Sequence, residues 1–289
     1  MKIKLLLSSV FLVSNLAYST HIKEGECSHV QETQKEELEI YTIQKFREID
    51  AHLNTLSQSK PRSKIHLVFD IDNTILTPDL DDIDINFIEL AYRATDGFYY
   101  QAKNEYLRMF KESDPENAKQ RAYRSAVDEW NEVVSGVYGQ VPYKLVDPDF
   151  VSWLNEKHEE GHPSMAHTAR EPVLESVTVK QLASFGIDFS LYSPFDGHKA
   201  TLDLPPEPAL FHNGIYIVGR GGISALHHKG NQYMNLLDLV RAPHQRDFIV
   251  VFVDDRREHV EGMVKILKQD GIRCVGFHIT TISAETEHK

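Results

Sequence analysis

Two aspartates and a threonine follow a short apolar run near residue 70. The run Leu67–Phe69 is too short for a typical helix and predicts a buried strand, after which Asp70, Asp72 and Thr74 stand at alternate positions. In open α/β sheets, ligands bind at the carboxyl ends of the strands. Two carboxylates crowded there repel each other unless a cation lies beside them. The segment therefore predicts a cation-dependent acidic site, and the alternative is a capped strand end with solvated acids.

A second acidic pair follows a second apolar run. Residues 247–253 are apolar and β-branched after Asp247, which predicts a fully buried parallel strand, and Asp254 and Asp255 come directly after it. The alternative is that this pair caps the helix that we expect to begin near Arg256 or Arg257.

Groups that suit an oxyanion occur between these acids. Thr168, Ala169 and Arg170 follow a weaker apolar run at residues 163–168, and a hydroxyl, backbone amides and a guanidinium all bind phosphate oxygens. An ordinary polar turn is the alternative interpretation.

A lysine between the acidic segments is a further candidate for the site. Lys229 precedes a segment with helical apolar spacing at residues 231–240, and a lysine at a helix start is disfavoured by the helix dipole unless an anion is near. Lys199 is the competing candidate, although no clear helix follows it.

Taken in chain order, as the segments at Asp70, Thr168, Lys229 and Asp254, the four resemble the motifs of the haloacid dehalogenase (HAD) superfamily, whose first motif is Asp-x-Asp-x-Thr. The resemblance spans residues 62–280 and looks like a poorly characterised group of exported bacterial members. It implies an α/β fold with a doubly wound, mostly parallel, Rossmann-like sheet and a helical cap inserted between the first and second motifs.

The resemblance also implies a reaction, which is Mg²⁺-dependent hydrolysis of a small phosphomonoester through an aspartyl-phosphate. It gives each matching residue a role: Asp70 is the nucleophile, Asp72 the general acid and base, Thr168, Ala169, Lys229 and Arg170 bind the phosphate, Asp70, the carbonyl of Asp72 and Asp254 bind Mg²⁺, and Thr74 and Asp255 support the site. A phosphotransferase with the same intermediate, or an exported non-catalytic binding protein on a HAD scaffold, are the alternatives.

The first 19 residues have the pattern of a secretory signal peptide. Lys2 and Lys4 precede the apolar run Leu5–Leu16, and residues 17–19 resemble a cleavage site. We expect a periplasmic or secreted protein without stable membrane insertion, and an uncleaved anchor is the alternative. Export permits a disulfide between Cys27 and Cys274, and two free thiols are equally consistent with the sequence.

The chain is acidic, with a formal net charge of −12. This charge argues against nucleic acid as a partner, because backbone binding needs cationic surface. It does not argue against a small phosphorylated substrate, whose local field is set by the site. The sequence leaves the oligomeric state open.

Helical spacing and turn signals predict the organisation of the chain. We expect a core domain at residues 20–85 and 142–289, and an aromatic-rich helical cap at 86–141. Within the core we expect an amphipathic helix over 32–56, an acidic flap at 78–85, a strand at 187–191 and a hairpin that turns at the glycines of 219–222.

Overall fold

The fold is that of a computed structural model, which describes residues 38–79, 96–195, 200–202, 209–219, 228–240 and 246–280. These residues form two compact units. The first unit contains residues 38–77 and 145–172 and the described residues from 181 to 280, and the second contains 78–79, 96–144 and 173–180.

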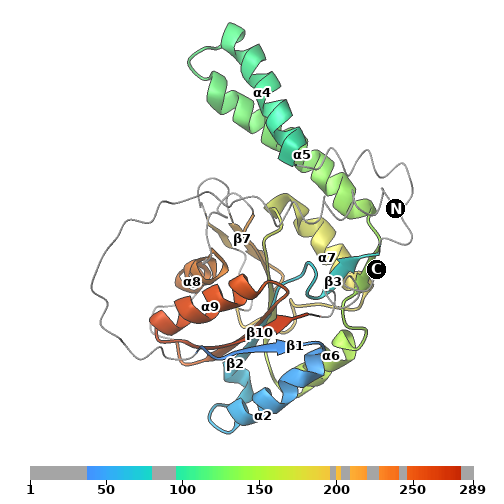
Figure 1. The fold of residues 1–289 in the computed structure, drawn as a ribbon, viewed down its shortest axis with the longest axis vertical. Helices are drawn as coiled ribbons and strands as arrows, with labels where there is room; N and C mark the ends of the chain where they lie inside the picture. Colours follow the sequence, from blue (N-terminus) through green and yellow to red (C-terminus); the bar gives the residue numbers. More distant parts are fainter. Residues whose placement is uncertain are drawn as a thin grey trace. The chain divides into compact units, whose positions relative to one another are not determined.

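An eight-stranded sheet forms the centre of the first unit (Figure 1). Its strands, in spatial order, are β1 (Ile40–Ile43), β10 (Arg273–Ile279), β9 (Ile249–Asp254), β2 (Ile65–Phe69), β5 (Ser164–Thr168), β8 (Ile215–Ile217), β7 (Ala209–His212) and β6 (Ala200–Leu202). The pairs from β1 to β8 are parallel, and β7 pairs antiparallel with both β8 and β6. The expected α/β fold with a mostly parallel sheet is confirmed.

Helices flank these strands and fill the connections between them. The first unit contains η1 (Phe46–Ile49), α2 (Asp50–Ser57), η2 (Arg62–Lys64), α6 (Phe150–Glu159), α8 (His228–Val240) and α9 (Arg257–Gln269). The second contains α4 (Asp96–Ser113) and α5 (Ala118–Gln140), while η4 (Pro172–Leu174), α7 (Glu175–Ser184) and the paired strands β3 (Leu76–Pro78) and β4 (Tyr143–Leu145) lie where the chain passes between units. Among the described residues, every helix is too short or too polar to span a bilayer.

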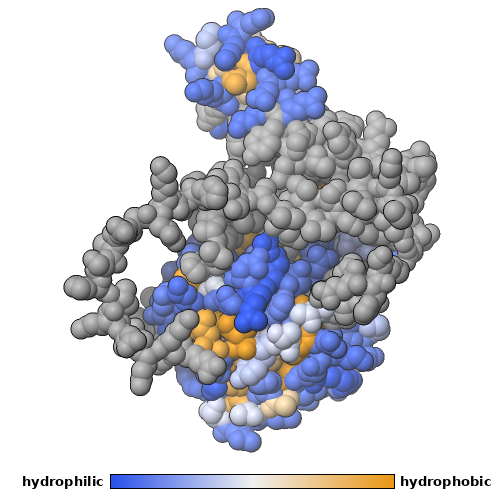
Figure 2. Space-filling model, in the orientation of Figure 1, coloured by the Kyte–Doolittle hydropathy of each residue, from blue (hydrophilic) through white to orange (hydrophobic). Residues whose placement is uncertain are grey.

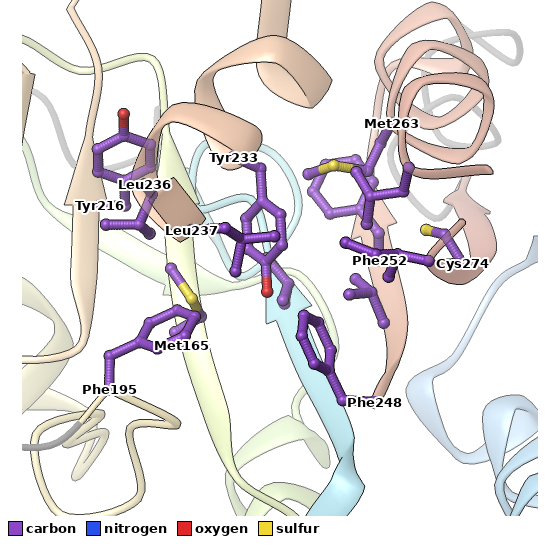
Figure 3. Packing of buried hydrophobic residues seen from close by; sticks show 14 of the residues in the cluster. Met165, Phe195, Tyr216, Tyr233, Leu236, Leu237, Phe248, Phe252, Met263 and Cys274 are labelled. Carbon is purple, nitrogen blue, oxygen red and sulfur yellow. The ribbon is translucent and has the colours of Figure 1, made fainter. Parts of the chain in front are cut away.

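Both faces of the central strands are buried, which explains their uninterrupted apolar sequences. On one face, Tyr233 and Leu237 of α8 pack with Met165 of β5, Phe252 of β9 and Met263 of α9 in a single cluster (Figure 3). The side chains of β2 alternate, so Val68 joins this cluster. On the other face, the ring of Phe69, the next residue of β2, packs against the rings of Phe46, Phe150 and Trp153.

The second unit contains a helical hairpin. Helices α4 and α5 pack side by side, and Ala118, Ala122 and Ala126 are buried at four-residue spacing along α5. Tyr106 of α4 donates a hydrogen bond to Glu129 of α5 at 3.0 Å. The part of the hairpin that is visible in Figure 2 is largely hydrophilic. The assignment of residues 86–141 as a cap, and the domain boundaries with it, stay predictions.

The predicted helix over residues 32–56 is wrong for residues 40–43. These residues form β1, which pairs parallel with β10 at the edge of the sheet, and α2 begins only at Asp50. The sequence Ile-Tyr-Thr-Ile is β-branched and aromatic, which favours a strand when a partner strand is available. Helical spacing alone did not reveal that partner, because β10 lies more than 200 residues away in sequence.

A hairpin that was not predicted from the sequence joins β7 to β8. Asn213 and Gly214 have φ values of 52° and 69° and join β7 to β8, as expected of an Asn-Gly turn. A Cβ atom at Gly214 would lie 2.3 Å from the carbonyl oxygen of Phe189, so the position also requires glycine for space. Residues 220–222 of the turn predicted at 219–222 lie outside the described residues, so that turn stays a prediction.

The strand predicted at residues 187–191 is also absent from the described chain. The side chain of Asp188 accepts hydrogen bonds from both the amide and the hydroxyl of Ser190, at 2.8 and 2.6 Å, which curls the backbone into a turn. The place beside β5 is taken by β8 instead.

Several predictions fall outside the described residues. These are the signal peptide at residues 1–19, Cys27, the acidic flap from residue 80 onward, residues 86–95 of the cap and Lys199. Cys274 itself is buried in β10. The disulfide between Cys27 and Cys274 and the export of the protein therefore stay predictions.

The buried side chain of His158 makes the stability of the fold depend on pH. The Nε2 atom of His158 lies 2.7 Å from the Ser164 hydroxyl, its ring stacks on Tyr192, and burial lowers its pKa from 6.5 to about 4. Between these two pH values, His158 is protonated in the unfolded chain and neutral in the folded chain. Stability that is present above pH 6.5 is therefore lost as the pH falls towards 4. The lost free energy of unfolding is about 3 kcal/mol.

Urea unfolding at pH 7.5 and at pH 4.5 checks this expectation. We expect the loss of stability on acidification to be smaller in His158→Gln than in the wild type, while His52→Gln, at a partly exposed position of α2, behaves as the wild type does. Equal losses in the wild type and His158→Gln would show that other groups carry the acid sensitivity.

Candidate active site

Two neighbouring strands bring the first and last acidic segments together. Asp70 follows β2 directly, and its backbone amide donates to the carbonyl of Val253 in β9 at 2.9 Å. Because β2 and β9 are parallel neighbours, Asp70 and Asp254 lie at the same edge of the sheet. One carboxylate oxygen from each of Asp70, Asp254 and Asp255 lies within 4.8 Å of the other two.

Lys229 lies between two of these carboxylates. Its Nζ atom is 2.5 Å from Oδ1 of Asp70 and 2.7 Å from Oδ2 of Asp254, and its side chain is 2% exposed. The next residue, Gly230, allows α8 to approach α9 closely, since a Cβ there would lie 2.9 Å from the carbonyl oxygen of Gly262. This close helix packing fixes the position from which the lysine enters the site.

A tight turn after β2 positions the remaining residues of the first segment. The carbonyl of Ile71 accepts amide hydrogen bonds from the end of the turn, and Asn73 has a φ of 60°, which asparagine tolerates better than most residues. The Thr74 hydroxyl accepts from the amide of Asp255 at 2.9 Å and lies 3.4 Å from Oδ2 of Asp70. Thr74 thereby joins the two acidic segments.

The segment at residues 168–170 contacts the segment at residues 70–74 through an ion pair. Nε and Nη2 of Arg170 donate to Oδ2 and Oδ1 of Asp72 at 2.9 and 2.8 Å, and Nη1 donates to Oε1 of Gln181 at 2.7 Å. Thr168 ends β5, the strand beside β2, and its hydroxyl accepts from the amide of Arg170 at 3.2 Å. Ala169 lies between them, half-buried.

Burial and mutual charge set the electrostatics of the cluster. Burial raises the pKa of Asp70 to about 6, although Lys229 opposes this. Burial also raises the pKa of Asp255 well above its usual value, and the charges of Asp254 and Asp70 add to it. Burial alone would raise the pKa of Asp254, but Lys229 and His259 hold it below its usual value. Burial opposes the charge of Lys229 too, yet Asp254 and Asp70 raise its pKa.

The donor set fits a divalent cation. Asp70, Asp254 and Asp255 offer three hard oxygen donors, which Mg²⁺ prefers, and Lys229 supplies only one balancing charge. Burial raises the pKa of Asp255, and the negative charges of Asp254 and Asp70 raise it further. A divalent cation beside the three carboxylates would offset these charges.

The site includes residues that the motif analysis missed. Nδ1 of His259, in the first turn of α9, lies 3.2 Å from Oδ2 of Asp254. The only available signal was a histidine one turn after an acidic pair. Gln181, which contacts Arg170, lies on α7 and carries no signal in the sequence.

The predicted residues thus fall into three groups. The structure brings Asp70, Lys229, Asp254, Asp255 and Thr74 into one contact network, pairs Asp72 with Arg170, and places Thr168 and Ala169 at the end of the neighbouring strand. The role of each residue in catalysis, phosphate binding or metal binding stays a prediction.

Comparisons with known proteins add a family and little about activity. Residues 42–289 match the model of a family described as "Protein of unknown function (DUF2608)". No curated protein matches the chain.

The solved structures that are similar to the chain include the following two. One is from Thermotoga maritima and assigned as a beta-phosphoglucomutase, with 15% identity, coverage of 78% of this chain and 99% of the other, and a TM-score of 0.32. The second is cytosolic 5'-nucleotidase IIIB bound to cytidine, with 11% identity, coverage of 82% and 88%, and a TM-score of 0.35. At these TM-scores neither structure bears on the function of the chain.

Proposed function

The chain belongs to this family of unknown function (DUF2608), and we propose that it is a Mg²⁺-dependent phosphomonoester hydrolase acting through an aspartyl-phosphate. The observation that carries the proposal is the position of Lys229 between Asp70 and Asp254, with Asp255 beside them. A buried nucleophilic carboxylate, an ammonium and a cation-binding acid set meet at the carboxyl end of parallel strands, where such sheets bind ligands.

The proposed reaction has two steps. An oxygen of Asp70 attacks phosphorus, and the bond to the ester oxygen breaks as Asp72 gives that oxygen a proton, so that the alcohol leaves. Asp72 then takes a proton from water, whose oxygen attacks phosphorus and displaces Asp70, which releases phosphate. Lys229 neutralises charge on the phosphoryl oxygens, and Thr168 and the amide of Ala169 bind them.

A bound Mg²⁺, held by Asp70, Asp254 and the backbone carbonyl of Asp72, would neutralise the phosphate charge as it approaches the carboxylates. Asp255 and Thr74 support this arrangement, because the Thr74 hydroxyl bridges the Asp255 amide and the side chain of Asp70. The carboxylates of this site would bind the cation, and Lys229 forms an ion pair with both Asp70 and Asp254.

Phosphate release from a panel of small phosphomonoesters, with Mg²⁺ and with a chelator, tests the proposal. We expect release that requires Mg²⁺, and calorimetry should detect Mg²⁺ binding to the wild type. Asp254→Asn should weaken that binding at least about tenfold by removing a charged ligand. Asp238→Asn, an exposed position on α8, is the matched control.

The proposal fails if the wild type neither releases phosphate nor binds Mg²⁺. Mg²⁺ binding that is equally strong in Asp254→Asn would place the metal elsewhere. Release that depends on an added alcohol acceptor would indicate a phosphotransferase with the same intermediate.

A further inference from the structure

We infer that Arg170 is a positioning residue that fixes the carboxylate of Asp72, and that it is not one of the groups that bind the transferred phosphate. The inference rests on the proposed function, in which Asp72 is the general acid and base. It differs from the assignment that residue type and spacing gave to Arg170 in the sequence.

Arg170 and Asp72 form two parallel hydrogen bonds. Arg170 presents Nε and Nη2 to the two oxygens of Asp72, at 2.9 and 2.8 Å, so both oxygens are held in one plane. Parallel bonds of this kind fix orientation as well as distance, which one bond from a lysine would not do. The edge of the guanidinium that suits a phosphate best is therefore used within the protein.

The two partners differ in burial. The side chain of Arg170 is 1% exposed, and that of Asp72 is 34% exposed. Oε1 of Gln181 accepts a hydrogen bond from Nη1 of Arg170 at 2.7 Å, so the buried guanidinium is held by Gln181 as well as by Asp72. A fixed, buried cation thus holds a carboxylate that solvent, and hence a leaving group, can reach.

The ion pair also acts on the side-chain rotamer of Asp72. Asp72 stands in the turn that reverses the chain after β2, next to Asn73 with its φ of 60°. The turn fixes where the side chain starts, but not its rotamer. The ion pair with Arg170 selects that rotamer. Displacing the carboxyl group by about 1 Å is enough to lower the reaction rate about a hundredfold.

Kinetics of Arg170→Gln and Arg170→Lys test the inference with two ester classes. A general acid matters most when the leaving alcohol is a poor one, so we expect kcat to fall about 10–100-fold on alkyl phosphates and much less on p-nitrophenyl phosphate. KM, and the inhibition constant of inorganic phosphate, should change little. Arg170→Lys should not restore the rate, since an ammonium cannot make the paired bonds.

Two further variants separate positioning from a general loss of structure. In an Asp72→Asn background, Arg170→Gln should cause little additional loss, because both changes remove the same function. Gln181→Leu should show a weaker form of the same dependence on the leaving group. Arg273→Gln, which removes an exposed arginine paired with Glu39 through two hydrogen bonds, is the matched control and should leave both rates unchanged.

The outcomes distinguish this inference from the proposed function. If Arg170→Gln raises KM and the phosphate inhibition constant, equally for both ester classes and additively with Asp72→Asn, Arg170 binds phosphate and the inference is wrong while the proposed function stands. If Arg170→Gln fails to fold, an equal effect of Gln181→Leu on both ester classes overturns the inference. Absence of phosphate release from the wild type overturns both.

Discussion

Asp70→Asn is expected to reduce phosphate release on the order of 10³-fold or more, with the fold retained. The amide has nearly the shape of the carboxylate but does not act as a nucleophile towards phosphorus. Lys229 keeps its bond to Asp254 in this variant, so the buried ammonium is not left without a partner. Initial rates on the best ester of the panel, with circular dichroism as the check on folding, measure the effect.

The comparison for Asp70→Asn is Asp247→Asn, an exposed aspartate that precedes β9 and pairs with Lys60. We expect the control to keep the rate of the wild type. If Asp70→Asn were to keep its rate within a few-fold, Asp70 would not be the nucleophile, whatever the metal dependence of the reaction.

Lys229→Met is expected to destabilise the protein strongly as well as to abolish phosphate release. Removing one partner of a buried ion pair leaves the other charge uncompensated, at a cost of about 3–5 kcal/mol. Here two carboxylates, Asp70 and Asp254, lose their shared cation at once. Mg²⁺ should restore part of the lost stability, because it supplies positive charge to the same acids.

Urea unfolding with and without Mg²⁺ measures this effect. Lys265→Met, at an exposed position on α9, is the matched control and should change the free energy of unfolding by less than about 0.5 kcal/mol. Lys199→Met tests the competing lysine in the same phosphate-release assay. Full stability and activity in Lys229→Met, with activity lost in Lys199→Met, would contradict the assignment.

The sequence predicted the centre of the fold because its signals there are local. The apolar runs before Asp70 and Asp254 are long enough to indicate buried parallel strands, and the acids that end such strands meet at one edge of the sheet. Lys229 was found because a lysine at a helix start is unfavourable without an anion, and both of its partners are carboxylates of this site.

The failures of prediction concern contacts between distant segments. Residues 40–43 become a strand because β10 is available beside them, and residues 187–191 turn because a side chain of their own captures the backbone. The bond between Arg170 and Asp72 joins residues 98 positions apart. Residue type alone allowed Arg170 to bind a phosphate as readily as a carboxylate, and only the folded chain distinguishes the two.

The most direct test of the account is chemical trapping of the intermediate on Asp70. The wild type would be mixed with Mg²⁺ and its best ester, quenched in acid, treated with borohydride and mapped by mass spectrometry, since borohydride reduces an acyl phosphate to an alcohol. The account predicts homoserine in place of aspartate at position 70, only when substrate and Mg²⁺ are both present. Rapid phosphate release with aspartate unmodified at position 70 in every sample would contradict it.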